Sequence, residues 1–398
     1  MGRLRTALAT LLLVAWGRAP LAAQRPRITG YYQNVGSAVA GTGGGSGTLA
    51  DLQRLRLMAT PAVGPFVLEL ALEHTLDWER TDATTSTSGL LASTRAGDDW
   101  LGIDWTIHQG RSVVWRQRPD RLNLALSRGA WSVRVGRQAI SWGTTLFLTP
   151  ADPFAPFDPA DPFREYRRGV DAVRAQWFPG PRSLVDMVVR PASTPDGTTL
   201  TALARGMTTW NGWELSAWGG RVHDAGAFAA GLTRSVGASA LRAEGAMRRD
   251  STGAWVFRGA VGLDRRVTVA GRDLYAVLEY QHDGFGAARA AELPAVTLSG
   301  PARRAELQVL GRDEAATQVT YQLRPLLGLE LLTLWNLRDG SGLIAPAASR
   351  SLSEEVSARA GVFLPVGTAG PTPAMPAMPG SEYGPQPAGA HVAVSAFF

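Results

Sequence analysis

The residues able to do chemistry in this chain are arginines, carboxylates and five histidines. The 398 residues include no cysteine, which excludes disulfides, thiolate metal sites and catalytic thiols. Lysine is also absent, so all 40 basic residues are arginine, and lysine-dependent phosphate loops and Schiff bases are excluded. The chemistry that remains is charge recognition by arginine and carboxylate, or acid–base work by histidine.

The histidines match no catalytic or metal-binding spacing. The sequence contains neither H-E-x-x-H nor G-x-S-x-G, the patterns of zinc hydrolases and of nucleophile elbows. Two histidines precede an aspartate, at His223-Asp224 and His282-Asp283. Neighbouring residues on a strand point to opposite faces, so they cannot act on each other as base and orienting group. We therefore expect no enzyme, no metal and no cofactor.

The first 24 residues have the composition of an export signal. Arg3 and Arg5 precede an apolar stretch, Ala7–Trp16, and a small-residue end at Ala23. This order is typical of a secretory signal peptide, so we expect residues 1–23 to be removed and residues 24–398 to form one domain. Without the signal, the formal charge of +6 becomes 37 arginines against 34 carboxylates, a net +3. No basic cluster indicates nucleic-acid binding.

Apolar and polar residues alternate along most of the mature chain. In residues 66–76, Leu68, Leu70 and Leu72 alternate with Glu69 and Glu73, and the same rhythm returns at 131–135, 255–263 and 274–280. A period of two gives a strand with one apolar and one polar face, and no run of about 18 uncharged apolar residues follows the signal. The sequence predicts an all-β fold: a closed antiparallel transmembrane β-barrel of about 14–18 strands, an even number, with short periplasmic turns and long extracellular loops.

Turn chemistry and loop composition divide the strands. Asn211-Gly212 is a strong two-residue hairpin signal between Trp210 and Trp213. Stretches rich in Gly, Ser, Thr or Pro are expected as loops at residues 36–47, 81–99, 144–165, 284–301 and 365–389. Residues 339–350 also have a loop-like composition, which leaves a single strand, at about 351–364, between two loops of the same side. An even barrel requires that one element here is misassigned.

The last eight residues favour a membrane barrel over a secreted β-sandwich, which is the alternative. Residues 391–398 alternate to the end and stop on Phe398. They resemble the C-terminal strand of bacterial outer-membrane barrels, which the barrel-assembly machinery reads. The resemblance implies a place in the cell outer membrane, with that machinery, membrane lipid and lipopolysaccharide as partners. The barrel must also close, because a sheet in hydrocarbon cannot leave an edge unpaired.

Residues 131–178 carry the most specific resemblance to a family. A strand ends in Gly136-Arg137-Gln138, a loop rich in Pro and Asp follows Trp142-Gly143, and a strand restarts after Arg168-Gly169. This order resembles the porin-like outer-membrane barrels of the alginate-export-type channel families. The resemblance implies passage of solutes across the outer membrane and does not define the solute.

Arg137 conflicts with regular alternation in this strand. If the apolar residues at 131, 133 and 135 face lipid, Arg137 faces lipid too, and an arginine near the bilayer midplane costs about 2–4 kcal/mol. We predict a β-bulge at Gly136 that shifts the phase by one. Arg137 then turns to the lumen, while Ile140 and Trp142 face outward. The alternative places Arg137 near a membrane interface.

The loop at residues 144–165 is unusually apolar and stiff for a solvated connection. Its prolines restrict the backbone, and its phenylalanines need cover. We predict that it folds inward or across the mouth as a constriction, with its aspartates facing lumen arginines, because rings of fixed charge set channel selectivity. A rigid outer cap is the alternative, and the aspartates fit no calcium-binding spacing. The candidate pore-lining residues are Arg134, Arg137, Gln138, Asp152, Asp158, Asp161, Arg167, Arg168, Asp171 and Arg174.

These features together predict an outer-membrane porin-like channel for passive passage of small hydrophilic solutes, with a modest arginine excess that favours anions. Two alternatives remain: a barrel hydrolase with a His/Asp site at the extracellular mouth, and a non-conducting surface or assembly barrel. More than about 14 strands leave an aqueous channel unless it is plugged, so the strand number discriminates. The aromatic residues expected in interfacial belts are Trp78, Trp100, Trp131, Trp142, Trp177, Trp210 and Trp213.

Overall fold

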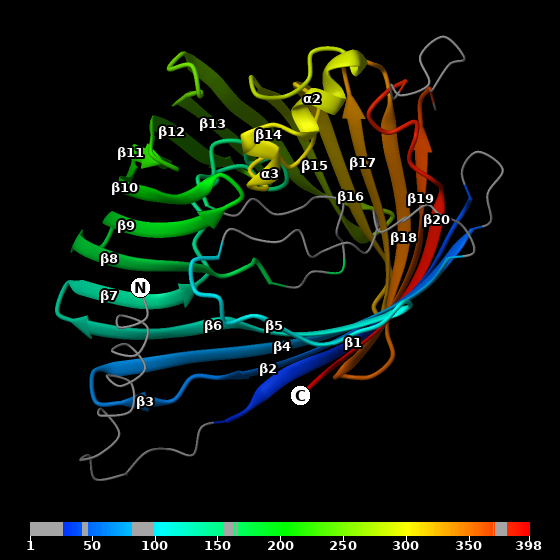
Figure 1. Ribbon diagram of the computed structural model, residues 1–398, viewed down its shortest axis with the longest axis horizontal. Coiled ribbons are helices and arrows are strands. Elements are labelled where there is room, and N and C mark those ends of the chain that lie inside the picture. The colour runs from blue at the N-terminus through cyan, green and yellow to red at the C-terminus, as the bar shows by residue number, and fades with distance from the viewer. Residues whose placement is uncertain are drawn as a thin grey trace.

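The computed structural model describes residues 27–41, 47–81, 99–154, 163, 166–368, 370 and 380–398. Of 20 strands, all but β3 and β5 form one closed antiparallel ring, which therefore has 18 (Figure 1). The ring closes where β1 pairs with β20, with Tyr31 opposite Phe397. The predicted closed barrel with an even strand number is confirmed. The predicted signal peptide and the candidates Asp158 and Asp161 lie outside the described residues.

The strands pair with their ring neighbours in chain order. They are β1 (Thr29–Val39), β2 (Thr48–Ala59), β4 (Phe66–Thr81), β6 (Val113–Arg128), β7 (Trp131–Gln138), β8 (Val170–Gly180), β9 (Ser183–Thr194), β10 (Gly197–Trp210), β11 (Trp213–Val222), β12 (Ala225–Val236), β13 (Ser239–Arg249), β14 (Trp255–Val269), β15 (Arg272–Asp283), β16 (Asp313–Arg324), β17 (Leu327–Asn336), β18 (Gly342–Ser351), β19 (Val356–Val366) and β20 (Gly389–Phe397). The short β3 (Ala62–Val63) pairs with β4, and β5 (Trp105–Gln109) pairs with the part of β6 that extends beyond β7.

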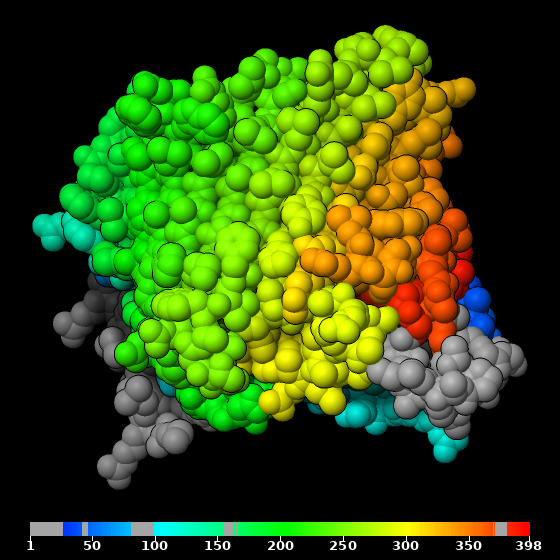
Figure 2. All heavy atoms as spheres, turned by 90° about the horizontal axis from the view of Figure 1, so that it is seen from above, coloured from blue at the N-terminus to red at the C-terminus, as the bar shows by residue number. Residues whose placement is uncertain are grey.

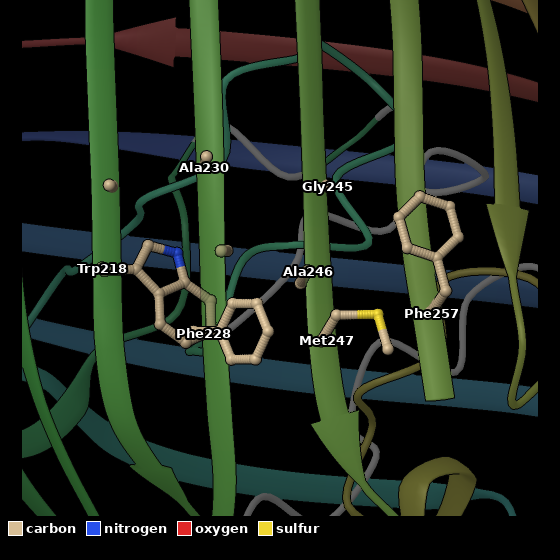
Figure 3. Close-up of a pocket in the computed structure, with 9 residues that line it drawn as sticks. Trp218, Phe228, Ala230, Gly245, Ala246, Met247 and Phe257 are labelled. Carbon is tan, nitrogen blue, oxygen red and sulfur yellow. The ribbon is translucent and has the colours of Figure 1, made fainter. Parts of the chain in front are cut away.

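Side chains alternate between the two faces of the ring. On β15, Leu278 is 57% exposed, whereas its neighbours Val277 and Glu279 are each 1% exposed. On β12 and β14, the exposed Phe228 and Phe257 belong to the outer wall (Figure 3). Figure 2 shows the outer face of the strands coloured green to orange as a continuous surface. Apolar side chains therefore face outward and charged ones inward, as the sequence predicts. Among the described residues, no helix is long and apolar enough to cross a membrane.

The two ends of the barrel differ in their connections. At the turn end, where β1 begins and β20 ends, two residues join β10 to β11: Asn211 has φ 47° and Gly212 has φ 77°, as the sequence predicts for a type I′ turn. At the loop end, long connections span residues 82–112, 139–169, 284–312 and 367–388. The third contains η1 (Ala290–Glu292), α2 (Leu293–Thr297) and α3 (Gly300–Arg303). Two other loop-end connections, at 195–196 and 223–224, are as short as the turns.

The misassigned element near the C-terminus is β18. Residues 342–350 have a loop-like composition but pair regularly with β17. Pairing with β19 is interrupted between Ile344 and Ala347, where Pro346 lies. Proline cannot donate a ladder hydrogen bond, and the small residues around it give a weak strand signal. The expectation of a loop over 339–350 is therefore wrong, because both neighbouring strands hold this segment in the ring.

The β-bulge predicted at Gly136 is also wrong. Strand β7 pairs with β6 and β8 through Gly136 without a register shift. The shift lies on β6, where Asp120 is skipped between the pairs that Arg121 and Pro119 make with β4. Between the turn end and this bulge, the side chains of β6 that face the lumen are at odd positions. Between the bulge and the loop end they are at even positions. The phase change that the sequence requires therefore occurs on the neighbouring strand.

Candidate solute channel

After β7 the chain turns into the barrel interior. The inner segment, residues 139–154, contains no strand, and its apolar side chains are buried on the inner wall. Ile140, Trp142 and Phe154 pack on inward residues of β8 to β13, and Leu148 packs with Phe163 on inward residues of β16 to β20, β1 and β2. The segment therefore touches opposite walls and crosses the lumen. The described part of the predicted loop lies inside the barrel and does not form an outer cap.

A carboxylate on the far wall holds the middle of the inner segment. Glu279 of β15 accepts hydrogen bonds from three consecutive backbone N–H groups, at 2.6 Å from Leu146, 2.9 Å from Phe147 and 2.8 Å from Leu148. A segment without regular structure must find partners for its buried N–H groups elsewhere. Bonds to a charged acceptor are stronger than bonds to a neutral one. Glu279 therefore fixes the position of the backbone in the lumen.

A second carboxylate and an amide hold the residues on either side of this stretch. Glu244 of β13 accepts from the backbone N–H of Thr144 and, at 3.0 Å, of Ala151. Gln308, in the connection before β16, accepts from the N–H of Thr149 at 2.5 Å and donates to the carbonyl of Phe147 at 2.6 Å. Two acids of the wall are thus used to hold the inner segment.

Trp142 lies inside the barrel, contrary to its predicted place in an aromatic belt. It is 2% exposed, packs edge-on against Phe154 with ring centroids 5.0 Å apart, and donates from Nε1 to Asp186 at 3.1 Å. Ile140, also predicted to face outward, is 2% exposed in the same cluster. Both predictions assumed that β7 continues past Gln138. The chain instead leaves the wall there, so strand alternation no longer applies.

Arginines of the inward phase line one side of the lumen. They are Arg54 and Arg56 on β2, Arg121 on β6, Arg134 on β7, Arg174 on β8, Arg190 on β9 and Arg205 on β10. Several are paired: Arg56 with Asp120 at 2.7 Å, and Arg134 with Glu69 at 2.8 Å. Of the seven, only Arg134 and Arg174 were predicted as pore residues. The other five could have been found from strand alternation, because each lies next to lipid-facing residues in sequence and must therefore point to the lumen.

Among the arginines of this wall, Arg205 has the most hydrogen-bond donors left for a ligand. It is 8% exposed, and its guanidinium carbon lies 5.7 Å from the centre of the Trp142 ring. Among the described residues it makes no hydrogen bond or ion pair, and its buried Nε is unpartnered. The neighbouring Arg174 is already held by Asp186 at 2.6 Å. Arg205 thus offers guanidinium donors that no other side chain uses, beside the inner segment.

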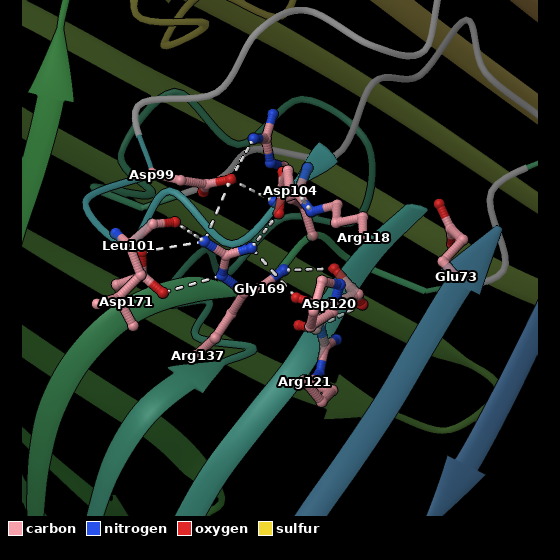
Figure 4. Close-up of polar contacts among 12 residues, drawn as sticks. Glu73, Asp99, Leu101, Asp104, Arg118, Asp120, Arg121, Arg137, Gly169 and Asp171 are labelled. Carbon is pink, nitrogen blue, oxygen red and sulfur yellow. Dashed lines mark hydrogen bonds and ion pairs between the residues drawn. The ribbon is translucent and has the colours of Figure 1, made fainter. Parts of the chain in front are cut away.

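Arg137 lies in a buried polar cluster at the loop-end edge of β7 and does not line the open lumen; Figure 4 shows its side chain among Leu101, Asp104 and Asp171. Its guanidinium is fully buried and binds Asp171 at 2.9 Å, Asp104 at 2.6 Å and the carbonyl of Leu101 at 2.8 Å. Neither predicted place, the lumen or a lipid interface, describes it. Strand β7 ends at Gln138, one residue after Arg137. The connection before β6 occupies the space beyond the end of β7 and covers Arg137.

A glycine of the predicted motif makes this packing possible. The N–H of Gly169 donates to Asp120 at 2.9 Å, and a Cβ on Gly169 would lie 2.1 Å from the Asp120 carbonyl oxygen and 2.9 Å from Cγ of Arg137. At Arg168-Gly169, just before β8, the backbone therefore passes so close to the bulge of β6 that only glycine fits.

The structure brings some of the predicted pore residues together. Asp152 accepts from Arg167 at 3.3 Å and from Ser141 at 2.7 Å, so one predicted aspartate–arginine pair forms inside the barrel. The side-chain amide of Gln138 donates to the carbonyl of Ala172 at 3.1 Å, which is a contact within the wall. The partners of the others are Asp171 for Arg137, Asp186 for Arg174, Glu69 for Arg134 and Asp99 for Arg168.

Asp99 links the loop-end cluster of Figure 4. It accepts from Arg118 and from Arg168, each at 2.8 Å, and Arg137 lies 3.6 Å away. Burial alone would raise the pKa of Asp99, but the three guanidiniums outweigh burial and hold that pKa below its usual value of 3.8. The cluster is therefore intact at neutral pH.

A second buried carboxylate joins the last connection to the barrel. Glu382 accepts from the N–H of Leu310 at 2.6 Å and from Asn336 at 2.7 Å. Its own N–H donates to Asp339 at 2.7 Å. Burial raises the pKa of Glu382 above its usual value of 4.5, and hydrogen bonds with Glu314, the Leu310 N–H and Asn336 offset that only in part. Three loop-end connections therefore meet at this side chain.

The histidines named as hydrolase candidates do find partners. His282 Nδ1 lies 2.8 Å from Oδ1 of Asp313 on the next strand, which is base–orienter geometry, but no hydroxyl among the described residues hydrogen-bonds to His282. His223 Nδ1 lies 2.7 Å from the hydroxyl of Thr199. Burial and nearby arginines lower the pKa of His223 to about 2, which makes it too weak a base at neutral pH. The described residues contain no cluster of three or more metal-ligating side chains.

A closed ring of 18 strands, apolar outside, charged inside and crossed by a tethered segment, is the architecture of a porin-like β-barrel. No family profile and no curated protein sequence matches this chain.

Solved structures share the fold across nearly the whole chain. The BenF-like porin from Pseudomonas fluorescens Pf-5 matches with a TM-score of 0.54 and 11% identity, covering 94% of this chain and 99% of that one. OccK2 (OpdF) from Pseudomonas aeruginosa, in complex with glucuronate, gives 0.53 and 12%, with 94% and 98% covered. OpdK from the same organism, with vanillate, gives 0.50 and 12%, with 93% and 98% covered. At these identities the likeness is one of fold.

Proposed function

We propose that this protein is an outer-membrane channel for passive passage of small hydrophilic anions. The observation that carries the proposal is the unequal distribution of free charge in the lumen. Inward arginines line the wall from β2 to β10, and Arg205 has no hydrogen-bonding partner among the described residues. The acids Glu244 and Glu279 across the barrel are occupied by the inner segment. Arg205 is therefore a positive charge that remains for a solute.

The position of Arg205 supports this reading. A charged group in a narrow passage with low-dielectric walls attracts counter-ions more strongly than one on an open surface. A guanidinium also presents paired donors that match a carboxylate. Two of the structures with this fold hold glucuronate and vanillate, and both solutes carry a carboxylate. We infer that small carboxylates are the solute class for this chain.

The test is ion selectivity in planar bilayers. Wild-type protein in a KCl gradient is expected to show a reversal potential on the anion side, and R205Q is expected to shift it toward zero. Glucuronate should block the wild-type current, and R205Q should weaken that block by about tenfold or more, since a bond to a charged group contributes about 1.5–3 kcal/mol. The matched control is R265Q, because Arg265 is an exposed arginine of β14 on the outer phase. An R265Q channel that loses selectivity as much as R205Q would contradict the proposal.

The proposal also includes the other properties that the sequence predicts. Residues 1–23 act as the export signal, Phe398 and its strand are read by the assembly machinery, and the resemblance to alginate-export-type channels stays a prediction. The hydrolase alternative has one supporting contact, between His282 and Asp313. It has no nucleophile among the described partners of that histidine, so the channel is the function the geometry supports best.

A further inference from the structure

The outer wall has a hollow where small residues of β11 to β14 meet. Ala217, Ala230 and Gly245 are among the small residues that line it, and Figure 3 shows Phe228, Met247 and Phe257 beside Ala230 and Gly245. Its volume is about 510 Å³. The three large side chains share one row of cross-strand positions, with Phe228 opposite Met247 and Met247 opposite Phe257. The row lies on the loop-end side of the small residues.

Two arginines stand beyond this row, at the loop end of the same face. Arg221 of β11 is opposite Gly226 of β12, and Gly226 lies beside Arg249 of β13, whose Cδ would be 3.9 Å from a Cβ at Gly226. The two arginines therefore flank one glycine across three strands, about 10 Å apart by strand spacing. Both are exposed, and neither makes an ion pair with any part of the chain that the structure describes.

The arginines and the hollow have different ligand preferences. Guanidinium pairs bind phosphate through forked hydrogen bonds, and Arg249 is already oriented by Trp255, whose ring centre lies 5.0 Å from its guanidinium carbon. The hollow is lined by carbon and can take an acyl chain. Arg249 lies four positions along the strand from Gly245, a distance of about 13 Å, which is within reach of an acyl chain attached to a phosphate-bearing head group.

We propose that the outer face of β11 to β14 is a binding site for a phosphorylated, acylated lipid of the leaflet at the loop end. The phosphate lies on Arg221 and Arg249, and an acyl chain fills the hollow at Gly245. The proposal rests on the outer-membrane location proposed above, where phosphorylated glycolipids of this kind form the outer leaflet. It concerns the outside of the barrel and is independent of the solute pathway.

The experiment measures lipid binding to the purified full-length protein by native mass spectrometry, with diphosphoryl lipid A and its dephosphorylated form as probes. The wild type should retain the diphosphoryl form. R221Q/R249Q should bind it about 30-fold more weakly, since each arginine near a membrane surface contributes about a fivefold factor. G245L, which fills the hollow, should weaken binding of both lipid forms. Equal binding by the wild type and R221Q/R249Q would overturn the proposal.

The matched control is R234Q. Arg234 lies at the turn end of the same wall, 5.0 Å over the ring of Trp213, so this variant loses the same kind of aromatic contact without facing the proposed site. R234Q should bind as the wild type does, and a loss equal to that of R221Q/R249Q would show a non-specific surface. Free pyrophosphate competing as well as the lipid would also overturn the proposal. All variants should keep wild-type conductance, which separates failure here from failure of the proposed channel function.

Discussion

The hydrogen bonds from the inner segment to Glu279 predict how the channel responds when that carboxylate is changed. Glu279 accepts three backbone N–H bonds through both of its oxygens. In E279Q one oxygen becomes an NH₂ group that faces an N–H donor. The variant also loses the negative charge that strengthens the remaining bonds. We expect the inner segment to leave the wall part of the time and the lumen to widen.

The magnitude follows from the contacts. Losing one charge-assisted bond costs about 1.5–3 kcal/mol, and leaving its buried donor unsatisfied adds about 1–3 kcal/mol. A total of about 3 kcal/mol lowers the ratio of docked to released segment roughly 150-fold. Glu244 and Gln308 still hold the ends of the segment, so the expected result is fluctuation between conductance levels and not complete opening.

The assay is single-channel recording in planar bilayers. E279Q should show a new, larger conductance level and more frequent transitions than the wild type. E330Q is the matched control: Glu330 also faces inward, but it pairs with Arg359 at 2.8 Å and makes no hydrogen bond or ion pair with the described residues 139–154. If E279Q and E330Q give the same single, wild-type level, the inner segment is not held by Glu279 and the reasoning fails.

Three further predictions follow from the same structure. Deleting residues 150–163 should raise single-channel conductance, and an unchanged value would show that this stretch is no constriction. G169A should destabilise the barrel by about 1–3 kcal/mol by overpacking against Asp120, measured as the unfolding midpoint in urea, whereas G206A, with open space at its Cβ, should not. Because the folded-state pKa of Glu382 is raised above 4.5, its contribution to docking of residues 380–388 is complete below that pH and lost as pH rises through the raised pKa. Amide exchange there should accelerate toward alkaline pH beyond the intrinsic rate, and E382Q should remove that excess.

Local sequence determined which face of each strand meets lipid. A period of two is a property of neighbouring residues, so Leu278 and Glu279 could be assigned to opposite faces before any strand was placed. The Asn211-Gly212 turn is equally local, because only residues that tolerate positive φ form it. Closure of the ring also follows from the sequence pattern, since a sheet in hydrocarbon cannot keep an open edge.

Contacts between distant segments decided the rest. The phase change near Arg137 was foreseen, but its place was not, because a register is a relation between strands and the bulge formed at Asp120. Strand β18 needed two neighbours to hold a proline in a sheet. Trp142 is buried because the chain turns inward after Gln138, and the acids that hold the inner segment lie 93 and 131 residues further along the chain than the residues they bind. No local pattern specifies such a pairing, because it exists only once the barrel has closed around the segment.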